Sequence, residues 1–258
     1  GGGVLEVDLS AGPFVTGTFA VTGYAEDGSE LFVYENGTLE EQASGVSLVS
    51  DATEFHELRP GLLSQLPPPA QNVINNIPGG LPPGLQADAG LTRCFAINLD
   101  GYQGDVLLRV TDASGDKAEY VDEASADLVE LTEDIRALAT ITAGTTAGVS
   151  VTPFSEAAVA LAERGATSDL DFANLTQADL STIRGLYASA SSIVSELVGA
   201  DPVQDRARPI NVTEAPSVQR AADAQYGLKL AALSQTDASV KDGLETLLQG
   251  VSVNAVNG

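Results

Sequence analysis

The chain has 258 residues, of which 43% are hydrophobic, which is enough to build a core and too many for a chain that is disordered throughout. Acidic residues outnumber basic ones by 36 to 12, giving a formal net charge of −24. Such a surface repels nucleic-acid phosphates and anionic membranes, and no basic patch offsets it, so we expect neither as a partner. The acids fit either a salty habitat, where charge keeps chains soluble, or a surface that binds divalent cations. Their scattered spacing favours the first.

The first half of the chain carries strand patterns. Residues 4–9 alternate apolar and acidic side chains, which is the period of a half-buried strand. Residues 14–24 and 31–34 are rich in β-branched and aromatic residues, and Asn36-Gly37 is a strong hairpin turn signal. Further strand-like segments cover 45–49, 94–99, 106–110, 118–121 and 149–151. We therefore predict an antiparallel β-sandwich domain over residues 1–151.

Residues 55–90 interrupt this pattern with a long proline-rich insertion. Loops of this length are uncommon in compact domains and tend to be functional or bound to a partner. The insertion also carries apolar side chains that need burial, on their own domain or on a neighbouring subunit. They include Leu62, Leu63, Leu66, Val73, Ile74 and Ile77.

From Thr152 the apolar period changes to that of a helix. Thr152-Pro153 is a helix start, and that helix is expected to stop at Gly165. Thr176 to Asp179 forms a capping box before a stripe that ends at Gly199. Two more helices are predicted over 218–234 and 238–249. The second domain, 152–258, is therefore predicted to be a bundle of about four helices with a strand-like tail at 251–256, and the whole chain to be of the α+β class.

Little in the sequence supports an enzyme. Cys94 is the single cysteine, so no intrachain disulfide exists, and its strand-like setting predicts a small buried side chain. The only histidine, His56, lies in a charged stretch that we interpret as a loop. The chain lacks a Gly-x-Ser-x-Gly elbow and a lysine-bearing phosphate loop, and it has too few His and Cys ligands for zinc. We predict no enzyme activity, no cofactor and no metal.

Calcium is the alternative that stays open. The EF-hand pattern is absent, but several acidic residues would gather at one edge of the sandwich. They are Asp112, Asp116, Asp122 and Glu123. Solvated acidic loops are the favoured interpretation of this group.

Three segments carry a resemblance to a known group. They are Ile97 to Leu108, the run Val149 to Val159 with its V-T-P-x-[ST]-E motif, and Tyr226 to Gln235 with its Y-G-L-x-L-A-A-L-S-Q motif. In this order they resemble proteobacterial surface proteins and lipoproteins that contain an immunoglobulin-like or transthyretin-like sandwich followed by a small helical domain. The resemblance covers about residues 92–250. It implies an extracellular or outer-surface location and a structural or adhesive role. The run Gly1-Gly2-Gly3 is similar to the glycine run that follows a lipidated cysteine in such lipoproteins, so a lipid anchor on a processed precursor is a further expectation.

Two functions follow. The first is a structural subunit of a surface filament, with copies of itself as partners and strand or loop exchange as the contact. Strand-like segments near both termini, with the apolar insertion, are the candidate contacts between subunits. At the termini they are Val4, Leu5, Val7, Leu9, Val251 and Val253. The second is a monomeric surface adhesin, or a glycan- or calcium-binding module. Glycine-rich ends are usually disordered unless held, and we expect both ends to be tied into structure.

Overall fold

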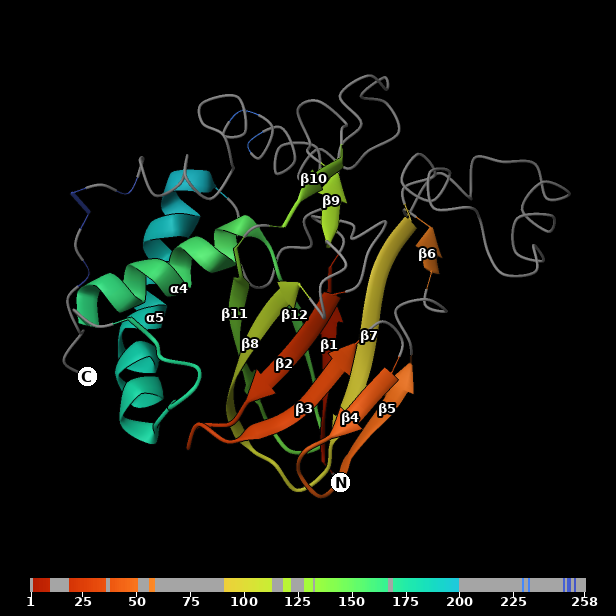
Figure 1. Cartoon of the computed structure of the whole chain (residues 1–258). Coiled ribbons are helices and arrows are strands. Elements are labelled where there is room, and N and C mark those ends of the chain that lie inside the picture. Colours follow the sequence, from red (N-terminus) through yellow and green to blue (C-terminus); the bar gives the residue numbers. More distant parts are fainter. Residues whose placement is uncertain are drawn as a thin grey trace, which may run out of the picture.

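Two β-sheets face each other, and two helices cover the outer face of one of them in the computed structural model of the chain (Figure 1). The structure describes residues 2–9, 19–35, 38–50, 56–58, 91–112, 118–121, 128–131, 133–166 and 169–199, with 229, 232, 248, 250, 251 and 253. The six predicted contact residues of the insertion therefore lie outside the described residues. So do most of the ranges predicted as the third and fourth helices.

Sheet I has four strands in the order β12-β1-β7-β5, and β6 also pairs with β7. Their bounds are β1 Gly3–Asp8, β5 Val46–Ser50, β6 His56–Leu58, β7 Leu91–Leu99 and β12 Thr146–Ser150. Sheet II has the order β11-β8-β2-β3-β4. Its strands are β2 Phe19–Tyr24, β3 Glu30–Glu35, β4 Thr38–Glu41, β8 Gly104–Asp112 and β11 Ile135–Ile141. A separate two-stranded sheet joins β9 (Glu119–Val121) to β10 (Leu128–Glu130).

Strand β1 lies in the middle of sheet I. It runs antiparallel to β7, with Leu5 opposite Ile97, and parallel to β12, with Val7 opposite Val149. The alternation that predicted this strand is confirmed, because Leu5 and Val7 are fully buried between the sheets. The parallel neighbour comes from much later in the chain, and the local pattern gave no indication of it.

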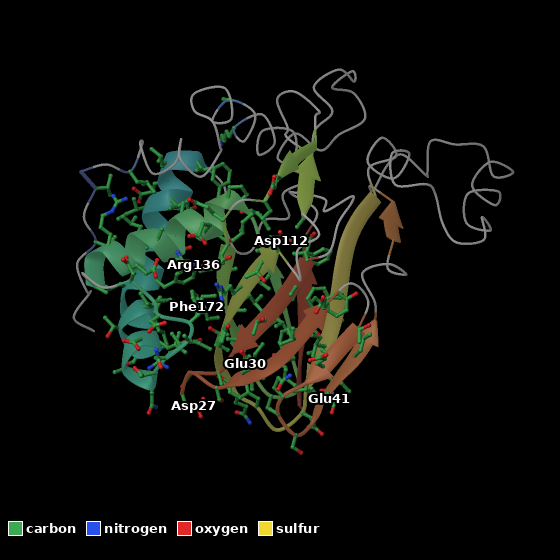
Figure 2. All side chains as sticks on the ribbon, viewed as in Figure 1. Asp27, Glu30, Glu41, Asp112, Arg136 and Phe172 are labelled. Atoms are coloured by element: carbon green, nitrogen blue, oxygen red, sulfur yellow. The ribbon has the colours of Figure 1, made fainter. Side chains whose placement is uncertain are left out.

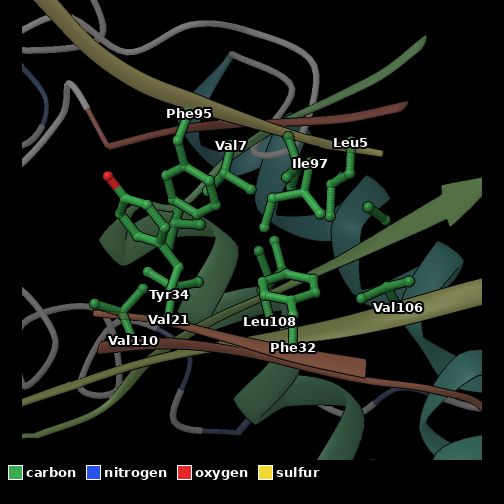
Figure 3. Close-up of a cluster of buried hydrophobic side chains, with 14 of the residues drawn as sticks. Leu5, Val7, Val21, Phe32, Tyr34, Phe95, Ile97, Val106, Leu108 and Val110 are labelled. Carbon is green, nitrogen blue, oxygen red and sulfur yellow. The ribbon is translucent and has the colours of Figure 1, made fainter. Parts of the chain in front are cut away.

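The core between the sheets is closed by aromatic and branched side chains (Figure 3). Tyr34 of sheet II stacks on Phe95 of sheet I, with ring centroids 4.2 Å apart and planes 12° apart. Offset stacking of this kind adds about 1 kcal/mol to the burial of two large side chains. Gly23 is required in β2, because a Cβ there would collide with the ring of the fully buried Phe32.

Helix α4 (Pro153–Ala166) begins as predicted at Thr152. The Thr152 hydroxyl accepts hydrogen bonds from the backbone N–H groups of Phe154 and Ser155, both at 3.1 Å. Helix α5 (Gln177–Val198) has the predicted capping box between Thr176 and Asp179. It ends at Gly199, whose φ of 68° is a left-handed conformation that glycine adopts without strain.

The predicted α+β class with a bundle of about four helices is wrong. The described part of the chain is mainly β, and its two helices are α4 and α5. Their apolar faces pack on each other and on Tyr24, Leu107 and Leu138, which project from the outer face of sheet II. An apolar stripe shows that one face of a helix is buried, but it does not distinguish another helix from a sheet as the covering surface.

The interpretation of His56 as a loop residue is also wrong. His56 lies in β6, where its backbone is opposite Arg93 and therefore one position from Cys94 on β7. Charged neighbours gave the stretch a loop-like composition, while its pairing comes from a strand far along the sequence.

Two glycines at the N-terminal end are held tightly by their own chain. A Cβ on Gly3 would lie 2.5 Å from Cγ2 of Ile141 and 2.9 Å from the carbonyl oxygen of Thr142. A Cβ on Gly2 would overlap the backbone of Asp100. The carbonyl of Gly2 also accepts a hydrogen bond from the Gly144 N–H at 3.3 Å. The absence of side chains at both positions lets β1 begin between two turns.

Candidate functional site

Four N-terminal residues predicted as contacts between subunits lie inside their own sandwich. Leu5, Val7 and Leu9 are buried in its core, and Val4 is half-buried on the other face of β1. Both sides of β1 are paired within the chain. A contact of these residues with another subunit would therefore require β1 to leave its own sheet.

The two C-terminal candidates lie against the helices. Val253 is buried and Val251 is half-buried in the core cluster of α4 and α5. Nearby, Arg164 donates a hydrogen bond to the carbonyl of Leu248 at 2.6 Å, and Gly165 packs closely on Val253. These contacts hold positions 248 and 253 on their own chain.

The edges of a sheet matter for assembly because their unpaired N–H and C=O groups can accept another strand. The two edges of sheet II are both protected. Strand β4 carries the exposed carboxylates of Glu40 and Glu41, and charge on an edge strand opposes pairing. In Figure 2, Glu41 lies on this side of the sandwich, opposite the side that faces the helices.

Helix α4 contacts the other edge strand, β11, at Arg136. The backbone N–H of Arg136 donates to the Glu156 carboxylate at 2.8 Å, and the carbonyl of Arg136 accepts from the Ser155 hydroxyl at 2.8 Å. Ser155 and Glu156 belong to the V-T-P-x-[ST]-E motif, and Thr152 of that motif caps the same helix. The motif thus starts a helix and satisfies a sheet edge with its first turn.

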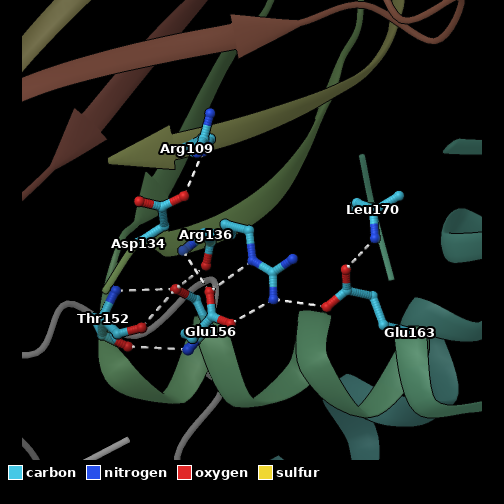
Figure 4. A network of polar contacts seen from close by, with 8 residues as sticks. Arg109, Asp134, Arg136, Thr152, Glu156, Glu163 and Leu170 are labelled. Carbon is cyan, nitrogen blue, oxygen red and sulfur yellow. Dashed lines mark hydrogen bonds and ion pairs between the residues drawn. The ribbon is translucent and has the colours of Figure 1, made fainter. Parts of the chain in front are cut away.

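The same turn forms a buried ion cluster (Figure 4). The Arg136 guanidinium donates to Glu156 at 2.9 Å and 2.6 Å and to Glu163 at 2.7 Å, while Glu156 is only 1% exposed. Burial lowers the pKa of Arg136, but the hydrogen bonds and charges of the two glutamates outweigh it, so the pKa is raised. Glu163 also accepts from the Leu170 N–H at 2.8 Å, which ties the chain beyond α4 to the cluster.

Two further arginines lie between the helical part and sheet II. Arg109 of β8 pairs with Asp134 at 2.5 Å and stacks over the ring of Phe172 at 4.2 Å. Arg184 of α5 donates to Glu26 at 2.8 Å. Arg184 therefore links α5 to sheet II, and Arg109 contacts Phe172 in the segment that follows α4.

Tyr102 forms hydrogen bonds beside Glu26, the residue that pairs with Arg184. The Tyr102 hydroxyl donates to the carbonyl of Asp105 at 2.6 Å and accepts from the Glu26 N–H at 3.0 Å. Burial, together with the charges of Glu26 and Asp105, raises the pKa of Tyr102 to about 12. The phenol is held in its neutral, hydrogen-bonding form.

Both edges of sheet I differ from those of sheet II. Neither β5 nor β12 contains a charged residue or a proline. Among the described strands, none pairs with the outer side of either one. Within the described residues, β5 and β12 therefore each have one side that no strand pairs with, although Ser150 at the end of β12 is buried.

The pairing of β5 with β7 determines which backbone groups of β5 point away from the sheet. The Asp100 N–H donates to the Gly45 carbonyl at 3.0 Å, so Gly45 faces β7 and alternation turns the backbone of Leu48 outward. The register shifts between Leu48 and Ser50, which places Val49 at a bulge. Leu48 is 36% exposed and Val49 60%, and they are two of the three large hydrophobic residues exposed in the described part.

The outward groups of β12 follow in the same way. The Val4 N–H donates to Thr145, and the Val151 N–H donates to Asp8, so the odd-numbered residues face β1. The backbones of Thr146 and Gly148 therefore point away from the sheet. Both residues are exposed, and a Cβ on Gly148 would meet nothing within 4 Å.

The described part of the chain also bears on metal binding. Its residues include no group of three or more His, Cys, Asp or Glu side chains placed to hold a metal ion. Of the four acids considered for calcium, Asp112 accepts a hydrogen bond from the Ala118 N–H at 3.1 Å, and the other three lie outside the described residues. Neither described helix is long and apolar enough to cross a membrane.

Comparison with known proteins does not add a relative. No model of a protein family matches the chain, and neither the curated proteins nor the solved structures contain a match.

Proposed function

We propose that the chain is a non-enzymatic structural protein of the cell exterior that assembles with copies of itself. The observation that carries this proposal is the unequal treatment of the sheet edges. Sheet II carries charge on β4 and is contacted by α4 at Arg136 of β11, whereas β5 and β12 of sheet I are uncharged and, among the described strands, unpaired on one side. Proteins that act as monomers usually block such edges, because an open edge invites pairing.

The net charge of −24 strengthens this argument. Copies of so acidic a chain repel one another over most of their surface, so contacts between them need patches without carboxylates. The open edges are two such patches.

The location outside the cell is part of the proposal and is supported by the resemblance of residues 92–250 to surface proteins. The strand exchange that the sequence suggested is replaced here by strand addition at existing edges. Addition leaves β1 in its own sheet, where its apolar side chains are buried.

Light scattering over a range of protein concentrations, with electron microscopy of the same samples, tests the proposal. We expect masses that rise with concentration to many times the 26.4 kDa of one chain, and elongated particles. A constant mass of one chain at every concentration and salt level would contradict it and would favour the monomeric adhesin.

A further inference from the structure

The two edge strands of sheet I, β5 and β12, run in the same direction. Strand β12 is parallel to β1, while β7 is antiparallel to both β1 and β5, so β5 and β12 run in the same direction. We infer that β5 of one copy adds to β12 of a second copy as a parallel strand, so that sheet I continues from subunit to subunit. This inference rests on the proposed function and specifies which surfaces meet.

The outward backbone groups define the register. In a parallel ladder, a residue whose backbone points at the neighbouring strand does not bond the residue directly opposite. Its N–H and C=O bond the residues before and after that one. Leu48 would then lie level with Ala147 of the second copy. The Leu48 N–H would donate to the carbonyl of Thr146, and the Leu48 carbonyl would accept from the N–H of Gly148. Strand β12 begins at Thr146, so the pairing begins at Leu48.

The side chains of the two edges are complementary in size. Leu48 and Val49 offer exposed apolar surface, while residues 146–148 of β12 are Thr, Ala and Gly. The small residues of β12 let Leu48 and Val49 approach closely, and this contact removes the apolar surface of both side chains from water. Neither strand carries a carboxylate, so the high negative charge of the chain opposes contact least along this line.

The geometry of this contact leads to an open assembly. Two different surfaces meet, so each added copy covers one free edge and brings another of the same kind, which produces a filament unless the rotation closes a ring. Pairing of β12 with β12 of another copy would instead use one surface twice and stop at a dimer. Edge variants separate these two modes.

The experiment uses Leu48→Lys and Gly148→Lys, because both positions are exposed and a lysine on an edge strand blocks pairing. Each variant loses one edge and keeps the other. Alone, each should raise the concentration needed for assembly by roughly tenfold or more. Mixed in equal amounts, they should form a dimer of twice the 26.4 kDa chain and no longer particle, because the intact β12 of the first fits the intact β5 of the second.

Matched controls keep the test decisive. Thr38→Lys places the same charge on the protected β4 edge and should assemble like the wild type. Gly148→Pro removes the outward N–H without adding charge and should act like Gly148→Lys, with circular dichroism verifying the fold of each variant. Assembly of both lysine variants at wild-type concentrations would overturn the inference while leaving self-assembly intact. Dimers of Leu48→Lys alone would also overturn it, in favour of β12 self-pairing. A wild type that stays monomeric would overturn the proposed function and this inference together.

Discussion

Glu156 accepts hydrogen bonds from both the backbone and the side chain of Arg136, at 2.8 Å from the N–H and 2.9 Å from Nε. One carboxylate therefore accepts from a backbone N–H of β11 and neutralises a buried guanidinium. The first turn of α4 is thereby fixed to one residue of β11, the edge strand of sheet II.

Removing this carboxylate should be costly. Glu156→Ala leaves a buried cation partly unpaired and a backbone N–H without its acceptor, so we expect the free energy of unfolding to fall by about 3 to 5 kcal/mol. Urea denaturation measures the change. Glu40→Ala, which removes an exposed carboxylate from β4, should change it by less than about 0.5 kcal/mol. Equal effects of the two substitutions would show that the cluster does not hold α4 on the sheet.

The capping box of α5 allows a comparison within one helix. Thr176→Ala removes the hydroxyl that accepts from the Asp179 N–H, and should lower the free energy of unfolding by about 1 kcal/mol. Thr182→Ala removes only an exposed hydroxyl that donates to the Ala178 carbonyl, and alanine is the better helix former. We therefore expect no loss of stability from Thr182→Ala in thermal denaturation, and a loss as large as that of Thr176→Ala would contradict the capping role.

Substituting alanine for glycine should change the free energy of unfolding in opposite directions at two positions of this chain. Gly185 lies within α5, and a Cβ there would meet nothing within 4 Å, so Gly185→Ala should raise the free energy of unfolding by about 0.5 to 1 kcal/mol. Gly3→Ala should destabilise the fold, because its Cβ would press on Ile141 and Thr142. Calorimetric melting temperatures that move in the same direction for both would be inconsistent with the close packing at the start of β1.

Tyr102 should make stability depend on pH in the alkaline range. Its pKa in the folded protein, about 12, exceeds the ordinary value of about 10, so the fold favours the neutral phenol. The stabilisation is complete below pH 10 and is lost as the pH rises from 10 to 12. Between pH 10 and 12 the free energy of unfolding should fall more steeply for the wild type than for Tyr102→Phe. Identical slopes would show that Tyr102 does not cause the pH dependence.

The local elements of the fold could be predicted from the sequence, whereas their partners could not. The alternation of residues 4–9 and the signals at Thr152, Thr176 and Gly199 each act within a few residues, and they correspond to β1, α4 and α5. The parallel pairing of β1 with β12 and the packing of α4 on sheet II depend on contacts between distant segments. The prediction of a helical bundle was wrong because the sequence pattern does not show contacts between distant segments.

The candidate surface could be predicted only in part. The lack of charge over residues 46–50 and 146–150, against Glu40-Glu41 on β4, is visible in the sequence once those segments are known to be edges. Which strands are edges is a property of the sheet order. Likewise, Ser155 and Glu156 stand in a recognisable motif, but the residue that they contact, Arg136, lies 19 and 20 positions earlier in the sequence.

Amide hydrogen exchange of the assembled protein tests the central claim most directly. We predict that the amides of Leu48 and Gly148 exchange far more slowly in assemblies than in dilute monomer, because each gains an acceptor on a neighbouring copy. The amide of Glu41 on the protected β4 edge should exchange at the same rate in both. Slower exchange at β4 with no change at Leu48 and Gly148 would contradict assembly through the open edges of sheet I.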